Sequence, residues 1–179
     1  MPRIQPVDPA SPPEAVAAQL SATRKAMGGV PNMFATAARS PATLTALNAF
    51  FGALGNGALG GKIGERVAIA VARQNGCEYC LAAHTALGGM HGVDAGELAS
   101  AQRGVSSDPK AAAALALAVA VLRTRGKVDD VTLNVAREAG LTDGEIVEVV
   151  AHVGLNVFTN FLNTIWRSEE RRVGKECRS

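Results

Sequence analysis

Apolar residues recur at intervals of three and four along most of this chain, which is the spacing of amphipathic α-helices. Together with its start and stop signals, the pattern predicts helices over residues 13–27, 40–54, 62–75, 77–88, 94–103, 108–125, 129–139 and 142–165. No stretch alternates apolar and polar residues between turn signals, as a half-buried strand does. The sequence therefore predicts an all-α fold.

Local signals fix several of the predicted helix ends. Ser40 followed by Pro41 is a favourable N-cap and first-turn pair, and the run from Thr142 to Glu145 reads as a capping box. Gly76 stands where a helix ends in the left-handed conformation. Residues 28–32, which include Gly28, Gly29 and Pro31, are predicted to form a loop.

Size and composition indicate one globular domain. The chain has 179 residues, of which 47% are hydrophobic and 19% charged. Aromatic residues make up only 4%, so we expect small, closely packed helices. The predicted organisation is an extended Pro-rich arm over residues 1–13 and a helical domain over residues 14–166.

Residues 167–179 differ from everything before them. The polar string RSEERRVGKECRS has no apolar period and resembles the in-frame translation of a sequencing adapter. Its five basic and three acidic residues give +2, which equals the formal net charge of the whole chain, so the remainder is neutral. The basic isoelectric point is therefore no evidence for nucleic-acid or membrane binding, and Cys177 is left out of any mechanism.

The sequence contains no predicted membrane span or export signal. The longest apolar run, residues 111–122, lies between Lys110 and Arg123 and reads as a core helix. The first residues, MPRIQPVDPASPPE, lack the apolar segment of a signal peptide. We therefore expect a cytoplasmic protein, and in a reducing cytosol a CxxC pair is typical of catalysis or metal binding.

The chemistry of this chain is concentrated in GERVAIAVARQNGCEYCLAAH. At about 100° per residue, Cys77, Cys80 and His84 fall within about 60° of one another on a helix. A helix N-terminus favours a thiolate, and His84 lies one turn beyond Cys80, within reach of its proton. Glu65, twelve residues before Cys77, can orient His84 or relay a proton.

This spacing suggests a redox hypothesis. Attack on a peroxide would leave Cys80 as a sulfenic acid, which Cys77 can condense with to form a disulfide. The rival is a structural metal module in which Cys77, Cys80 and His84, with or without Glu65, hold Zn²⁺. A thioredoxin-like oxidoreductase lacks its βαβ context, and His152, in an apolar helix, reads as a satisfied core or interface histidine.

Residues 30–165 resemble the AhpD-like alkylhydroperoxidase group of the carboxymuconolactone decarboxylase superfamily. The motifs that carry the resemblance are Glu65 with its spacing to CEYCLAAH, together with VPNMFATAARSP and HVGLNVFTNFLN. The resemblance implies an AhpD-like helical bundle that forms homo-oligomers, often trimers or multiples of them. It also implies Cys80 as the peroxidatic and Cys77 as the resolving cysteine, with Glu65 and His84 as the proton relay.

The resemblance further implies a hydroperoxide substrate, a dithiol reductant such as a lipoyl-bearing protein, and no cofactor or metal. Tyr79 stands where characterised members carry a second histidine, so the relay is shortened or Tyr79 supplies the missing hydrogen bond. The decarboxylases proper lack the CxxC pair, which argues against lactone decarboxylation. The alternative function within the same chemistry is a catalytically weak thiol–disulfide oxidoreductase or redox sensor.

Overall fold

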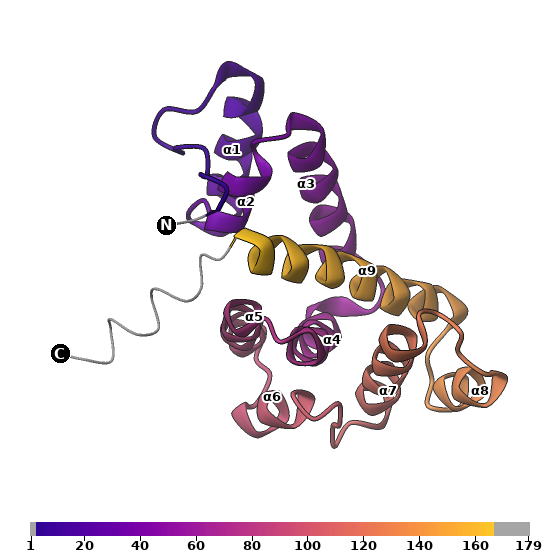
Figure 1. Ribbon diagram of the computed structural model, residues 1–179. Helices are drawn as coiled ribbons and strands as arrows, with labels where there is room; N and C mark the ends of the chain where they lie inside the picture. The colour runs from indigo at the N-terminus through magenta and orange to yellow at the C-terminus, as the bar shows by residue number, and fades with distance from the viewer. Residues whose placement is uncertain (1–2, 167–179) are drawn as a thin grey trace. The chain divides into compact units, whose positions relative to one another are not determined.

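The structure, a computed structural model, describes residues 3–166 (Figure 1). These residues form nine α-helices and no strand: α1 Glu14–Met27, α2 Asn32–Ala37, α3 Pro41–Gly55, α4 Gly60–Asn75, α5 Glu78–Met90, α6 Ala95–Ala101, α7 Pro109–Thr124, α8 Asp130–Glu138 and α9 Asp143–Trp166. The predicted all-α fold is confirmed. Residues 1–2 of the predicted arm and the whole predicted tail, residues 167–179, lie outside the described residues.

The predicted helix ends are confirmed by their hydrogen bonds. The Thr43 N–H donates to Ser40 Oγ at 3.3 Å at the start of α3. Gly76 ends α4 with φ 67°, in the left-handed conformation. The capping box before α9 is reciprocal, since the Thr142 N–H donates to Glu145 Oε2 at 2.9 Å and the Glu145 N–H donates to Thr142 Oγ1 at 3.2 Å.

One helix was not predicted. The predicted loop over residues 28–32 ends one residue early, because Asn32 already begins α2, with Pro31 as its N-cap residue. Five of the six α2 residues are buried, so the segment has no polar face and is too short to show a helical period. Its position in the core, rather than its own pattern, stabilises it.

The chain divides into two compact units. The first comprises the chain up to Ala53 and the end of α9 from Leu162, and the second comprises Leu54–Phe161. In the first unit, Thr23 of α1 donates to Asn48 of α3 at 3.1 Å, and the rings of Phe34 and Phe51 lie 5.5 Å apart. The Val7 N–H donates to Ala35 O at 2.9 Å, which ties the arm to α2.

The second unit is built around α4. Every residue from Val67 to Ala72 is buried, which is expected of a helix surrounded on all sides. Helices α5, α6 and α7 pack against it, and α8 packs on α7. Complete burial of Ile69, Leu115 or Leu117 contributes about 1.5–3 kcal/mol each.

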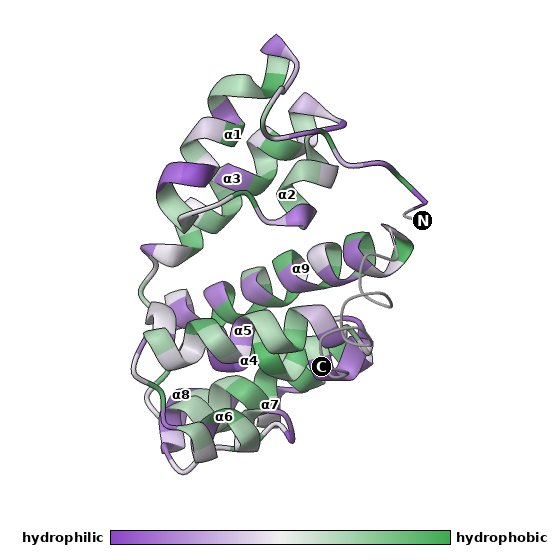
Figure 2. Ribbon diagram, turned by 90° about the vertical axis from the view of Figure 1, so that its left-hand side faces the viewer, coloured by the Kyte–Doolittle hydropathy of each residue, from purple (hydrophilic) through white to green (hydrophobic). Residues whose placement is uncertain are grey.

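Helix α9 contributes Ile146, Val149 and Val153 to the core of the second unit. Hydrophobic and hydrophilic residues alternate along its ribbon in Figure 2. By length and composition alone α9 could cross a membrane, with a mean hydropathy of 1.2 over its most apolar window. Because 44% of that window is buried inside the protein and Ile146, Val149 and Val153 join the core, we interpret α9 as a core helix.

A buried ion pair fixes the α6–α7 connection to α4. Arg66, only 6% exposed, bonds Glu97 at 3.2 Å and Ser106 at 2.9 Å. Hydrogen bonds from Ser106 and Ser107 to Glu97 lower the pKa of its carboxyl to about 2. Glu97 is therefore ionised throughout the physiological pH range and holds the connection in place.

Candidate functional site

The turn between α4 and α5 places the two cysteines. Gly76 adopts the left-handed conformation, and the Cys77 N–H then donates to Ala72 O at 3.0 Å. Cys77 is consequently the N-cap of α5, and the Cys80 N–H points at its Sγ at 3.3 Å. The sequence predicted Cys77 inside the first turn, and the structure places it one position earlier.

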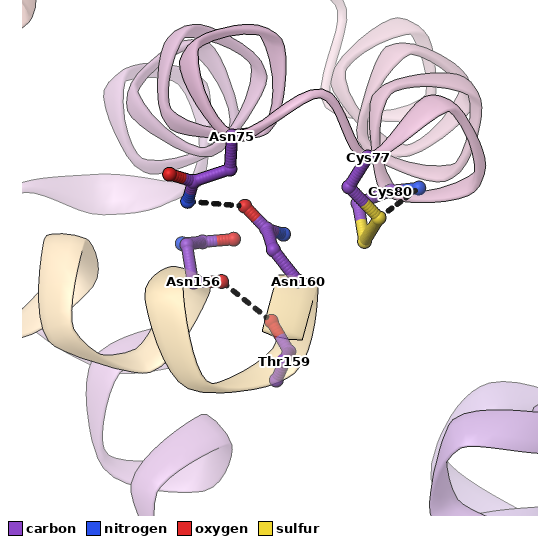
Figure 3. Close-up of a disulfide and its surroundings, with 6 residues drawn as sticks. All are labelled: Asn75, Cys77, Cys80, Asn156, Thr159 and Asn160. Carbon is purple, nitrogen blue, oxygen red and sulfur yellow. Dashed lines mark hydrogen bonds between the residues drawn. A yellow bond between two sulfur atoms is a disulfide. The ribbon is translucent and has the colours of Figure 1, made fainter. Parts of the chain in front are cut away.

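Cys77 and Cys80 are joined by a disulfide, with Cα atoms 5.3 Å apart. The pair closes because three residues of a helix start bring both side chains to the same side (Figure 3). Both cysteines are buried, at 1% and 3% exposure, against Ala72 and Leu81. This N-terminal position is one where free N–H groups and the helix dipole stabilise a thiolate after reduction.

Glu65 and His84 form the second pair of the site. His84 Nδ1 lies 2.8 Å from Glu65 Oε2, and both side chains are mostly buried. This bond fixes the ring of His84 and directs its other nitrogen, Nε2, away from the carboxylate. The predicted partnership of Glu65 and His84 is present, and His84 follows Cys80 by one turn of α5.

Close packing of α4 and α5 brings Glu65 to His84. Gly88, one turn after His84, lies against Glu65, since a Cβ added at Gly88 would be 3.6 Å from the Glu65 Cβ. The same atom would be 2.5 Å from Leu98 Cδ2 of α6, so only glycine fits there without rearrangement. The glycine therefore allows Leu98 of α6 to pack closely against α5.

A polar face of α9 lies beside these pairs, and the sequence analysis did not identify it. Asn75 of α4 donates to Asn160 Oδ1 at 2.9 Å, and Asn160 lies between Asn75 and the disulfide in Figure 3. Asn156 and Thr159 on the same helix are also buried. The signal in the sequence was the spacing of His152, Asn156 and Asn160, which places three polar residues on one face of an apolar helix.

His152, predicted as a satisfied core or interface histidine, lies outside the fully buried core. It is half-buried, and its Nε2 is buried with no hydrogen-bond partner among the described residues. Burial lowers the pKa of His152, an effect that the negative charges of Glu148 and Glu65 partly oppose. Tyr79, in contrast, is exposed.

The same geometry bears on the alternative in which Cys77, Cys80, His84 and Glu65 hold a zinc ion. Among residues 3–166, no three His, Cys, Asp or Glu side chains form a group that could hold a metal ion. Two of the four proposed ligands are joined by a disulfide, and the other two bond each other.

A model of the carboxymuconolactone decarboxylase family matches residues 41–120, which include Glu65, Cys77, Cys80 and His84. The match covers 80 of the 179 residues and supports the predicted resemblance to the carboxymuconolactone decarboxylase superfamily. His152 and the polar face of α9 lie outside the matched segment. A search of curated proteins finds no significant match.

Several solved structures share the fold of this chain. A peroxidase-related protein from Silicibacter sp. TM1040 is 23% identical, with a TM-score of 0.79 over 92% of this chain and 89% of that one. A peroxidase-related protein with an AhpD core from Ralstonia eutropha JMP134 is 24% identical, with a TM-score of 0.79 over 91% and 88%. A cysteine variant of the debrominase Bmp8, in complex with 2,3,4-tribromopyrrole, is 18% identical, with a TM-score of 0.79 over 93% and 90%. The fold therefore supports more than one activity.

Proposed function

We propose that this protein is a thiol-dependent peroxidase that reduces hydroperoxides through the Cys77–Cys80 pair. The observation that carries the proposal is the disulfide at the start of α5, one helical turn from an imidazole bonded to a carboxylate. These parts supply a nucleophile, a second thiol that closes the cycle, and a proton carrier. The match to the carboxymuconolactone decarboxylase family supports an enzyme. The debrominase of similar fold is the reason for testing a second substrate class.

In the oxidative half of the cycle each cysteine makes one nucleophilic attack, and His84 carries one proton. His84 takes the proton of Cys80, and the thiolate attacks one peroxide oxygen while the O–O bond breaks. The alkoxide takes the proton from His84 and leaves as an alcohol. Cys77 then attacks the sulfur of the Cys80 sulfenic acid, and the hydroxyl leaves with the Cys77 proton as water. The peroxide has gained two electrons, and the two thiols have become the disulfide.

A dithiol restores the two thiols. One thiolate of the reductant attacks the disulfide and its second thiol displaces the enzyme cysteine, so the reductant leaves as its own disulfide. Because both cysteines are buried, we propose a slender dithiol such as a lipoyl arm on a partner protein. We also propose that the enzyme works in the cytoplasm as a homo-oligomer, a trimer or a multiple of it. Light scattering after gel filtration measures the number of subunits directly.

Steady-state turnover with cumene hydroperoxide and dihydrolipoamide tests the assignment. Every variant is made in a Cys177→Ser background, so that the tail cysteine does not react. We expect Cys80→Ser to abolish turnover and His84→Gln to lower it by about 100-fold, the usual contribution of a general acid–base. The matched control Glu138→Gln, at an exposed site on α8, should turn over at the starting rate.

Four outcomes would contradict the proposal. Unchanged turnover in Cys80→Ser would refute its role as the attacking cysteine. A stoichiometric zinc ion with thiols that resist peroxide would support the metal module instead. Release of bromide from 2,3,4-tribromopyrrole, with no peroxide reduction, would assign the site to dehalogenation. A disulfide that forms and is reduced again, but with negligible turnover, would indicate the redox sensor.

A further inference from the structure

One buried imidazole has no role in the cycle proposed above. His152 of α9 has its Nε2 buried and without a hydrogen-bond partner among the described residues. Folded proteins rarely leave a buried polar atom unpaired, so such a group calls for an explanation. The Asn156 side chain donates to His152 O at 2.9 Å, which engages the backbone of His152 and leaves its ring uncommitted.

The ring of His152 lies against α4 directly beside Glu65. A Cβ added at Gly64 would be 2.8 Å from His152 Cε1 and 3.3 Å from Nε2. Only a glycine at position 64 therefore allows the ring to reach this depth. Gly64 precedes Glu65, so the contact places the imidazole next to the residue that holds His84.

Three charged or titratable groups from the surrounding helices act on this ring. Glu65 of α4 and Glu148 of α9 favour the protonated form of His152, and a proton on His84 of α5 disfavours it. Burial outweighs the two carboxylates and lowers the pKa of His152. The ring is therefore neutral at pH 7, with one nitrogen able to donate and the other able to accept.

We propose that His152 is a positioning residue of the cysteine site, whose neutral imidazole acts through Glu65 on the proton affinity of His84. His84 uses Glu65 Oε2. The ring of His152 lies beside this carboxylate with no hydrogen bond from its Nε2, so it acts by its dipole and by displacing water from the charge, which adjusts how strongly His84 takes the proton of Cys80. This role rests on the proposed function, in which His84 is the base.

The histidine resonances of the oxidised protein give the first test. The chain has three histidines, so each Cε1–H signal can be followed by NMR across a pH series and assigned from single variants. We expect Glu65→Gln to lower the pKa of His152 and His84→Gln to raise it, each by about half a unit, since charges within a few ångströms produce shifts of this order. His91 serves as the internal control. A His152 titration that is the same in both variants would overturn the proposal.

The reactivity of Cys80 gives the second test. With Cys77→Ser and Cys177→Ser, Cys80 is the only thiol, and its rate of alkylation by iodoacetamide is measured against pH. We expect His152→Gln to move the midpoint by about half a pH unit. Gly64→Ala, which displaces the ring but keeps it, should move the midpoint in the same direction. Gly154→Ala, at a position on α9 with open space around it, should leave the midpoint in place.

If the alkylation rate of Cys80 has the same pH profile in His152→Gln as in the parent protein, His152 does not act on the cysteine site. Thermal melts of each variant show whether the fold is kept, and Gly64→Ala tests the ring's position without removing it. Because alkylation requires no peroxide, this test is independent of turnover. A protein that fails to reduce any peroxide refutes the proposed function, whereas an unmoved alkylation midpoint refutes the role of His152.

Discussion

At the scale of single residues, two glycines allow close packing around the site. Gly88 accommodates the side chain of Leu98 against α5, and Gly64 accommodates the ring of His152 against α4. Neither glycine has a positive φ, so their requirement is for space and not for backbone freedom. A sequence cannot reveal such a requirement, because the atoms that would collide belong to helices that are distant along the chain.

Gly88→Ala is expected to lower the free energy of unfolding by about 1–2 kcal/mol. Its Cβ would be 2.5 Å from Leu98 Cδ2, and overpacking of this kind costs about 1–3 kcal/mol, against a gain of up to about 1 kcal/mol from better helix propensity. Gly89→Ala, at a position with open space, should be neutral or stabilising. Urea unfolding measures both. Equal stability of the two variants would show that the Leu98 contact relaxes without cost.

The reactive residues themselves were predictable. Cys77, Cys80 and His84 were identified because neighbouring turns of one helix place side chains together without knowledge of the tertiary fold. Glu65, on the preceding helix, was identified only from its spacing to the CxxC motif. The structure joins them as the pairs Cys77–Cys80 and Glu65–His84. Their catalytic roles remain predictions. The surroundings of His152 could not be predicted, because its neighbours come from α4 and α5, far away in the sequence.

At the scale of helices, the helix ends could be predicted from nearby residues in the sequence, whereas the packing of one helix on another could not. Ser40, Gly76 and the Thr142–Glu145 capping box act within a few residues of the helix ends that they fix, so the sequence was sufficient there. Helix α2 was not predicted because it is short and buried on nearly all sides, so its sequence shows no alternation of polar and apolar faces. The turn before α4 was also beyond the sequence, since the Ala58 and Leu59 N–H groups donate to Glu148 on α9.

Glu148→Gln should lower the free energy of unfolding by about 1–2 kcal/mol. The Ala58 and Leu59 N–H groups donate to its two carboxylate oxygens at 2.9 and 2.8 Å, just ahead of α4. A glutamine keeps one acceptor and turns an NH₂ group toward the other N–H, which leaves a donor unpaired. Glu138→Gln, on the exposed face of α8, should change stability by less than about 0.5 kcal/mol. Equal urea midpoints for the two variants would show that the hydrogen bonds to Glu148 do not stabilise the fold.

At the scale of the whole molecule, acid stability should depend on Glu97. The Ser106 and Ser107 hydrogen bonds lower its pKa from 4.5 to about 2, so its contribution is fully present above about pH 4.5 and is lost as the pH falls toward about 2. The melting temperature of the parent protein should therefore exceed that of Glu97→Gln near neutral pH, and the difference should shrink between about pH 4.5 and 2. A difference that stays constant over this range would contradict the shifted pKa.

The predicted tail gives a second test at this scale. We expect removal of residues 167–179 to leave the melting temperature and helical content unchanged, because every described helix ends by Trp166. The isoelectric point should fall below the present value of about 8.6, since the segment carries the whole +2 charge. Circular dichroism and isoelectric focusing measure these quantities. A lower melting temperature would show that the segment belongs to the folded protein.

The most direct test of peroxidase function is a count of thiols. The Cys177→Ser protein is fully reduced, freed of reductant and mixed with one equivalent of hydroperoxide, and its free thiols are then titrated. We expect both remaining thiols to disappear together, with an intramolecular Cys77–Cys80 disulfide in the mass spectrum and one alcohol formed per disulfide. Two thiols that persist through a tenfold excess of several hydroperoxides would contradict the proposed function.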